Sequence, residues 1–285
     1  MKSLITAGAN IETPDNRGIT PLIQASEGTA YMPNNAPFVQ ALLEKSAKVD
    51  TQDKQGRSAL FLAASEGKVD AVNLLLDGKA DPNQKDNNGA TPLQMAVTYG
   101  KTDVVKTLLK RGATVDAADS SGNTPLMIAS EGSAYIPNNG PLVQLLLEAG
   151  AKIDPQDSRG RTAFYRAAAE GREDAIRLLL EHKADINQRP TDGATPLMAA
   201  VSNAKLAGVK LLLDRGADPN LADPRGNTPL MIAADGGPGL PRSAEYAAAL
   251  LTKGAKKDAV DDRGRTALAR ATEEKNTAVI DLLKK

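Results

Sequence analysis

Residues 86–118 of the 285-residue chain read DNNGATPLQMAVTYGKTDVVKTLLKRGATVDAA. The stretch opens with a tight turn from Asp86 to Gly89, in which glycine supplies the positive φ that such a turn needs. Thr91 follows as a candidate helix N-cap, and Pro92 then falls in the first helical turn, where its missing N–H does no harm. This half of the stretch therefore predicts a turn that leads into a short helix.

The other half predicts a second, longer helix and an extended return. Gly100 marks the end of the first helix, as glycine commonly does. Apolar residues at helical spacing then form one face of a second helix, at Val104, Val105, Leu108 and Leu109. Gly112 ends that helix, and the chain runs extended toward the next turn.

The same unit recurs along the chain and can be followed by the triplet Thr-Pro-Leu and its variants. The triplet starts at Thr20, Ser58, Thr91, Thr124, Thr162, Thr195, Thr228 and Thr266. The steps between these positions repeat as 38, 33 and 33 residues, so residues 26–44 and 130–148 are near copies of one another, 104 residues apart. A three-unit module is therefore duplicated, and the first unit of each module carries five extra residues.

A helix pair of this size cannot cover its own apolar face, so copies have to stack on one another. We therefore expect an all-α fold, a solenoid of helix-turn-helix units with short β-turn or hairpin tips, arranged as a curved superhelical array.

The unit resembles the ankyrin repeat. The resemblance is carried by the pattern D-x-x-G-x-T-P-L, by the A-x-x-x-G turn that follows, and by the ending with LLL and G-A. It covers essentially the whole chain and implies a single ankyrin-repeat domain over residues 1–285, with 1–14 as a partial N-terminal unit. About eight units are expected, starting near residues 15, 53, 86, 119, 157, 190, 223 and 261.

The sequence departs from the family pattern at the end of three second helices. Ser46, Lys79 and Lys183 stand where the other units have glycine. If these residues keep the left-handed conformation, each costs on the order of 1 kcal/mol. We expect local softness at these positions rather than loss of the fold.

The five extra residues fall between the two helices of units one, four and seven. Asn35, Asn139 and Ser243 align in the three copies, and each is a good N-cap residue, so we predict that each marks the start of a second helix. The loops before them carry Tyr31 and Tyr135. Two readings stay open for these tyrosines, which either pack on the adjacent unit or contact a partner.

Composition excludes several classes of function. Lys plus Arg equals Asp plus Glu, so a nucleic-acid partner is not expected. No apolar run is long enough to cross a membrane, so no membrane insertion is expected. Cysteine is absent, which excludes disulfides and thiolate metal sites. We expect a soluble monomer, with a cytoplasmic location favoured over export.

The sequence shows no catalytic, cofactor-binding or metal-binding constellation. The tip aspartates recur in nearly every unit, so they are interpreted as turn formers rather than acid–base groups. His182 is the only histidine, and it falls at the end of a second helix, where its partial positive charge suits the helix dipole. One histidine without cysteine makes neither a zinc site nor a triad. We therefore expect no enzyme activity and no cofactor.

Charge is unevenly placed along the unit. The variable tip positions hold many arginines, and the ends of the first helices hold Glu27, Glu66, Glu131, Glu170, Asp235, Glu273 and Glu274. One edge of the concave face is thus expected to be basic and the other acidic. This segregation either reflects ordinary solvated edges or matches a partner of complementary charge.

The resemblance implies a non-enzymatic scaffold that binds a protein partner through its concave face and hairpin tips. Tyr and Arg are common interface anchors, and the candidate partner-binding residues are Arg57, Tyr99, Arg159, Arg161, Tyr165, Arg166, Asn203, Arg225 and Arg265, with Tyr31 and Tyr135 on the inserted loops. One alternative is a binder of a small or polyanionic ligand that uses the arginines as a strip. Another is an engineered or trimmed repeat scaffold with no native partner.

Overall fold

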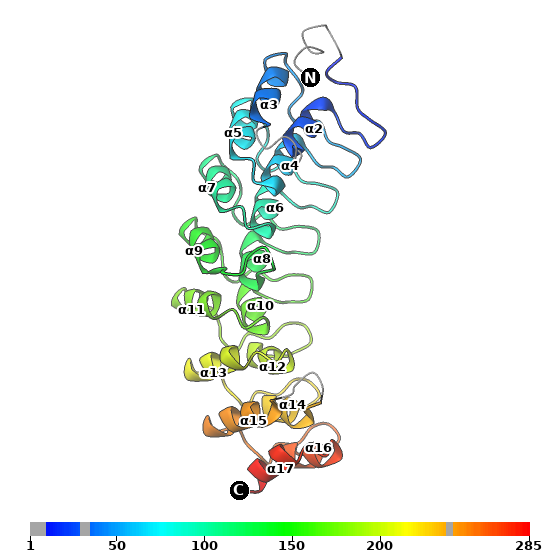
Figure 1. Ribbon diagram of the computed structural model, residues 1–285. Helices are drawn as coiled ribbons and strands as arrows, with labels where there is room; N and C mark the ends of the chain where they lie inside the picture. Colours follow the sequence, from blue (N-terminus) through cyan, green and yellow to red (C-terminus); the bar gives the residue numbers. More distant parts are fainter. Residues whose placement is uncertain (1–9, 29–34, 238–241) are drawn as a thin grey trace. The chain divides into compact units, whose positions relative to one another are not determined.

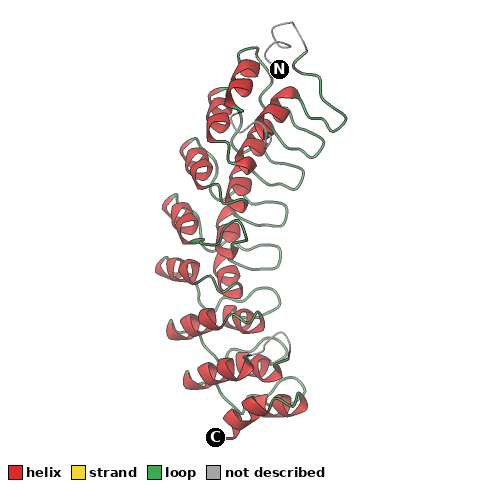
Figure 2. Ribbon diagram, in the orientation of Figure 1, coloured by secondary structure: helices red, strands yellow, loops and turns green. Residues whose placement is uncertain are grey.

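The computed structural model describes residues 10–28, 35–237 and 242–285. They fall into two compact units, residues 1–129 with 133–152 and residues 130–132 with 153–285. Among the described residues every named element is an α-helix, and the connections are turns and loops (Figure 2). The expected all-α class is confirmed, while a single domain over 1–285 stays a prediction.

The helices come in eight consecutive pairs in the described part of the chain. The first unit holds α2 (Pro21–Glu27), α3 (Ala36–Leu43), α4 (Ala59–Glu66), α5 (Val69–Asp77), α6 (Pro92–Thr98), α7 (Thr102–Lys110), most of α8 (Pro125–Glu131), and α9 (Gly140–Glu148). The second holds α10 (Ala163–Ala169), α11 (Glu173–Glu181), α12 (Pro196–Ser202), α13 (Leu206–Asp214), α14 (Pro229–Asp235), α15 (Ser243–Thr252), α16 (Ala267–Glu273) and α17 (Thr277–Lys284).

Each first helix of a pair begins after the Thr or Ser that the sequence predicts as its cap. In α6 the Thr91 hydroxyl accepts a hydrogen bond from the Gln94 backbone N–H, and the Gln94 side chain accepts one from the Thr91 N–H. The same hydroxyl cap is present in the other seven first helices. Two of the four free N–H groups at the start of α6 are satisfied in this way.

The tip aspartates hold the turns, as the sequence predicts. Asp53 Oδ1 accepts hydrogen bonds from the backbone N–H groups of Gln55 and Arg57, both at 2.9 Å. The same pair of bonds forms at Asp15, Asp86, Asp119, Asp157, Asp223 and Asp261. Several neighbouring tips within each unit are joined by a backbone hydrogen bond, such as that from the Lys54 N–H to the Arg17 carbonyl at 2.9 Å.

The helices of each unit pack in two rows, one of first helices and one of second helices (Figure 1). In the first unit α4 packs against α2 and α6, and α5 packs against α3 and α7. In the second unit α12 lies between α10 and α14, and α13 lies between α11 and α15. Leu60, Leu75, Leu93 and Leu108 are fully buried between these rows. Burial of each such side chain contributes about 1.5–3 kcal/mol, so neighbouring repeats supply most of each other's stability.

The three departures from glycine do adopt the left-handed conformation. The φ angles are 63° at Ser46, 71° at Lys79 and 68° at Lys183. Ala204 and Lys275 also have positive φ, at the ends of first helices where other repeats have glycine. The fold therefore imposes the same backbone conformation on residues that do not favour it.

The aligned asparagines stand at the starts of the second helices, as the sequence predicts, but their side chains do not form the usual capping hydrogen bond. Asn35 and Asn139 precede α3 and α9 with right-handed backbone angles, and neither side chain makes a capping hydrogen bond. Asn35 Nδ2 instead donates to the carbonyl oxygens of Ala25 and Ser26, at 2.9 and 3.0 Å. A capping residue has an extended backbone, whereas here the amide is turned back toward the end of the preceding helix.

Ser243 also stands at the start of its helix, although it is not the N-cap residue. It is the first residue of α15, and Arg242 occupies the N-cap position. Its hydroxyl accepts a hydrogen bond from Asn276 Nδ2 at 2.9 Å, which links it to the next repeat. In all three copies this position ties the inserted segment to a neighbouring element.

Tyr135, on the inserted loop of the fourth repeat, packs on the preceding repeat. Its ring lies edge to face with that of Tyr99, with the centroids 5.3 Å apart, and Ile136 beside it is buried. A side chain at Gly100 would come within 2.6 Å of the Tyr135 carbonyl oxygen, so only glycine allows this approach. Tyr135 is still 65% exposed. Tyr31, its counterpart in the first repeat, lies outside the described residues.

Replacement of Asn35 tests the role of the amide. Asn35→Ala leaves two buried carbonyl groups without their donor, and we expect a loss of about 1–3 kcal/mol in the free energy of unfolding. Asn35→Ser is the discriminating variant, because serine is a good N-cap but is too short to reach these carbonyls. We expect both variants to be destabilised in urea denaturation. Wild-type stability of the serine variant would show that Asn35 acts as a cap.

Candidate functional site

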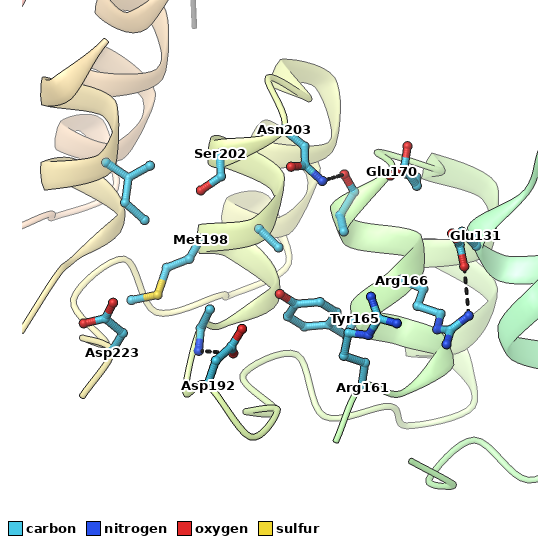
Figure 3. A pocket seen from close by; sticks show the side chains of 14 residues that line it. Glu131, Arg161, Tyr165, Arg166, Glu170, Asp192, Met198, Ser202, Asn203 and Asp223 are labelled. Atoms are coloured by element: carbon cyan, nitrogen blue, oxygen red, sulfur yellow. Dashed lines mark hydrogen bonds and ion pairs between the residues drawn. The ribbon is translucent and has the colours of Figure 1, made fainter. Parts of the chain in front are cut away.

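A groove crosses three consecutive first helices of the second unit, α10, α12 and α14 (Figure 3). We call it the α10–α14 groove, and its volume is about 380 Å³. It is lined by Glu131, Arg161, Tyr165, Arg166, Ala169, Glu170, Asp192, Ala194, Met198, Ala199, Ser202, Asn203, Asp223 and Ile232. Four of these side chains carry carboxylates and two carry guanidinium groups, so the acidic groups outnumber the basic ones.

Arg166 lies at one end of the groove and joins two repeats. It is only 7% exposed. Its Nη1 donates to Glu131 Oε2 at 2.8 Å, and its Nη2 donates to Asp157 Oδ2 at 2.5 Å. Both interactions are charge-assisted, which makes them stronger than neutral hydrogen bonds. Arg166 is therefore a buried ion-pair centre rather than an exposed side chain that a partner contacts directly.

Asp157 receives more hydrogen bonds than the other tip aspartates. It accepts the N–H groups of Arg159 and Arg161, the Arg161 Nε at 2.9 Å, and the Arg166 guanidinium. Burial alone would raise the pKa of Asp157, but the hydrogen bonds from the Arg161 N–H and the Arg166 side chain lower it to about 2. The carboxylate therefore stays charged at neutral pH.

The duplicated module shows which parts of this ion-pair centre are variable. Arg270, 104 residues beyond Arg166, makes a similar connection to Asp235 and Asn227. The residue 104 positions before Arg166 is Leu62, which is buried. The same repeat position thus accepts either a buried leucine or a paired arginine.

Tyr165, the neighbour of Arg166, forms part of the floor of the groove. Its side chain is 9% exposed. In Figure 3 its hydroxyl points toward the side of the groove where Asp192 and Met198 lie. Burial raises the pKa of the Tyr165 hydroxyl, and the charge of Asp192 raises it further. Tyr165 is therefore protonated at neutral pH and can both donate and accept a hydrogen bond.

The structure brings four of the sequence-predicted residues into this groove, namely Arg161, Tyr165, Arg166 and Asn203. Asn203 is exposed, and its Nδ2 donates to the Ala169 carbonyl at 3.0 Å. Arg159 and Arg225 are exposed at their tips outside the groove lining.

The remaining predicted arginines are held by their own tips. Arg57 and Arg265 each bind the aspartate four positions earlier, Asp53 and Asp261, with N–O distances of 2.7 and 2.9 Å. Arg161 binds Asp157 in the same way. An arginine strip of this kind is largely neutralised by the chain itself. Tyr99 belongs to the first unit and contacts Tyr135.

Sequence reasoning did not select Asp192 or Met198 as site residues. Asp192 is the exception among the tip aspartates, because Pro190 occupies the usual turn position of its repeat. Its Oδ1 accepts only one tip hydrogen bond, from the Ala194 N–H at 3.0 Å, and its side chain is exposed. The shift of the aspartate by two positions was the signal that could have identified it.

The described residues form neither a metal-binding cluster nor a membrane-spanning helix. Within residues 10–28, 35–237 and 242–285, no group of three or more His, Asp or Glu side chains could hold a metal ion. His182 Nδ1 lies 2.9 Å from the Leu178 carbonyl within its own helix turn, consistent with a structural role. In the same described ranges, no helix is long and apolar enough to span a membrane.

The repeats are similar to those of known proteins. The family model described as "Ankyrin repeats (3 copies)" matches residues 1–86, 63–138, 132–223 and 209–285. The ankyrin repeat domain of Bcl-3, described as a unique member of the IκB protein family, is similar in structure with a TM-score of 0.68 and 27% sequence identity. The match covers 81% of this chain and all of that domain. No curated protein sequence matches the chain.

The buried ion pair gives a mutational prediction. Asp157→Ala leaves the Arg166 guanidinium buried without its inner carboxylate, which costs about 3–5 kcal/mol in the free energy of unfolding. Arg166→Leu restores the residue type of position 62, and we expect it to cost less than about 1.5 kcal/mol. Urea denaturation of the two variants checks this order, and equal losses would contradict it.

The lowered pKa of Asp157 gives a prediction for acid. A carboxyl group whose pKa falls from 3.8 to about 2 on folding stabilises the fold above its unfolded pKa, and that stabilisation is lost as pH falls toward 2. The stability difference between wild type and Asp157→Asn should therefore shrink as the pH is lowered from about 5 to about 2. Thermal denaturation across this range measures it. A difference that does not change with pH would show that Asp157 does not titrate with the fold.

Proposed function

Because the chain belongs to the ankyrin repeat family, we propose that it is a non-enzymatic scaffold that binds a protein through the α10–α14 groove and the tips beside it. Ankyrin repeats are generally protein-binding scaffolds. The observation that carries the proposal for this chain is a groove of about 380 Å³ that spans three consecutive repeats. Its walls are packed first helices, so little backbone ordering is needed when a partner binds.

The groove combines the features of an interface centre. Tyr165 supplies aromatic surface, Ala169 and Ile232 supply apolar surface, and Ser202 and Asn203 supply polar groups at the rim. Interfaces commonly place aromatic and apolar anchors at their centre and polar groups around them. Tyr165 and Arg166 act here through the shape and charge of the groove, because both are buried.

A polyanionic ligand bound by an arginine strip is the less favoured alternative. Arg57, Arg161 and Arg265 are each paired with an aspartate. Carboxylates also outnumber guanidinium groups in the groove. An anionic ligand would therefore have to displace existing ion pairs or overcome repulsion.

The groove can be blocked without disturbing the core. Ser202 is exposed on α12 and lines the groove, so Ser202→Trp fills it with a large side chain. Ala207 is exposed on α13 and does not line the groove, so Ala207→Trp is the matched control. We expect most peptides selected on the intact chain from a random display library to lose at least about tenfold in affinity on Ser202→Trp.

The control decides the interpretation of this experiment. The selected peptides should bind Ala207→Trp as they bind wild type, since the outer face of α13 is outside the proposed interface. Selected peptides that bind both tryptophan variants with wild-type affinity would mean that binding takes place elsewhere on the chain.

A further inference from the structure

Tyr165 is a mostly buried residue whose hydroxyl is a polar group of the groove. The side chain is 9% exposed, and the hydroxyl has no hydrogen-bond partner among the described residues. It points into the α10–α14 groove (Figure 3). This hydroxyl is therefore available to form a hydrogen bond with a group that enters the groove.

The acidic group that we consider together with this hydroxyl is Asp192. Its carboxylate lines the groove and is exposed at the rim. Its one hydrogen bond is from the Ala194 N–H, and it forms no ion pair within the described part of the chain. Unlike the other tip aspartates it does not occupy the usual turn position, so its presence is not required to hold the tip in the usual way.

The two arginines of the groove do not neutralise Asp192. Arg166 is bound to Glu131 and Asp157, and Arg161 is bound to the same Asp157. Asp223, a further carboxylate of the lining, contributes to the negative charge of the groove. The free charge that a ligand meets there is therefore negative.

The wall beside these groups is apolar. Ala169, Ala194 and Ile232 line the groove and are partly exposed. An alkyl chain can pack on such a wall, and a cation at its end can reach both a carboxylate and the rim of an aromatic ring. Lysine and arginine side chains have this construction, with an apolar stem and a cationic head.

The other copy of the module holds different residues at these positions. The positions 104 residues earlier hold Phe61, Asn88 and Gln94 in place of Tyr165, Asp192 and Met198. Phe61 is buried just as Tyr165 is. The second copy of the module therefore differs from the first by a hydroxyl and a negative charge in the groove.

We propose that the α10–α14 groove binds a lysine or arginine side chain of a basic partner segment, with Tyr165 and Asp192 receiving the cationic head and the partly exposed Ala169 contacting the alkyl stem. This inference rests on the proposed function and names the chemistry of the partner. The carboxylate forms a charge-assisted hydrogen bond with the cation. The Tyr165 hydroxyl accepts a second N–H of the same group.

The probe is a capped nonapeptide with one central arginine among glycine and serine residues, titrated into the ¹⁵N-labelled intact chain. We expect amide shifts around Ala194 and Met198 and much smaller shifts with the norleucine or citrulline peptide. Tyr165→Phe and Asp192→Asn each should weaken binding by about tenfold, the effect of one hydrogen bond to a charged group. Each variant introduces the residue type found 104 positions earlier, phenylalanine as at position 61 or asparagine as at position 88. Both variants are therefore expected to fold.

Asp262→Asn is the control for net charge. Asp262 is an exposed tip residue of the same unit and does not line the groove. The Asp262→Asn variant should bind the arginine peptide as wild type does. Equal weakening by Asp262→Asn and Asp192→Asn would overturn the proposal, since it would reduce the effect to long-range charge. Equal binding of the norleucine and arginine peptides would overturn it as well.

Two further outcomes separate related hypotheses. If n-butylguanidine binds as tightly as the arginine peptide, the occupant is a small cation, and a protein segment is excluded as the specific ligand. If library peptides lose binding on Ser202→Trp but show no preference for lysine or arginine, the scaffold function stands and this inference fails.

Discussion

Each helix pair has an apolar face that only its neighbours can cover, and this constraint governs the rest of the structure. Leu93 on α6 and Leu108 on α7 are fully buried although their helices are 7 and 9 residues long. Isolated helices of this length are not stable in water. The tip hydrogen bonds and the hydroxyl caps fix the conformation of each repeat, while stacking supplies the free energy that keeps it folded.

Much of the fold could be predicted because its signals are local. The Thr91 cap, the Asp53 turn and the left-handed Lys79 each depend on residues within a few positions of one another. The side-chain contacts of Asn35 were not predictable for the opposite reason. Its neighbours in sequence favour a cap, but its amide binds carbonyls 9 and 10 residues earlier, at the end of the preceding helix. The five extra residues change which partners are within reach.

The candidate site was predictable only in part. Tyr165 and Arg166 attract notice because they interrupt an alanine-rich helix, and both do lie at the groove. Their burial was not readable from the sequence, because neighbouring repeats cover them and the amount of cover depends on side chains far away in the chain. Asp192 was not predicted because every tip aspartate was interpreted as a turn former. In this repeat Pro190 occupies the usual turn position, and Asp192 lies two positions later.

The duplicated module separates what the scaffold requires from what one copy has added. Leucine at position 62 and arginine at position 166 are both buried in equivalent repeats, so the arginine is one of two solutions to the same packing problem. The Tyr165 hydroxyl is a different case, since phenylalanine at position 61 fills the same place without a polar group that needs a partner. A hydroxyl that packing does not need, beside a carboxylate that holds its tip by one hydrogen bond but has no cationic partner among the described residues, is more simply explained by recognition than by stability.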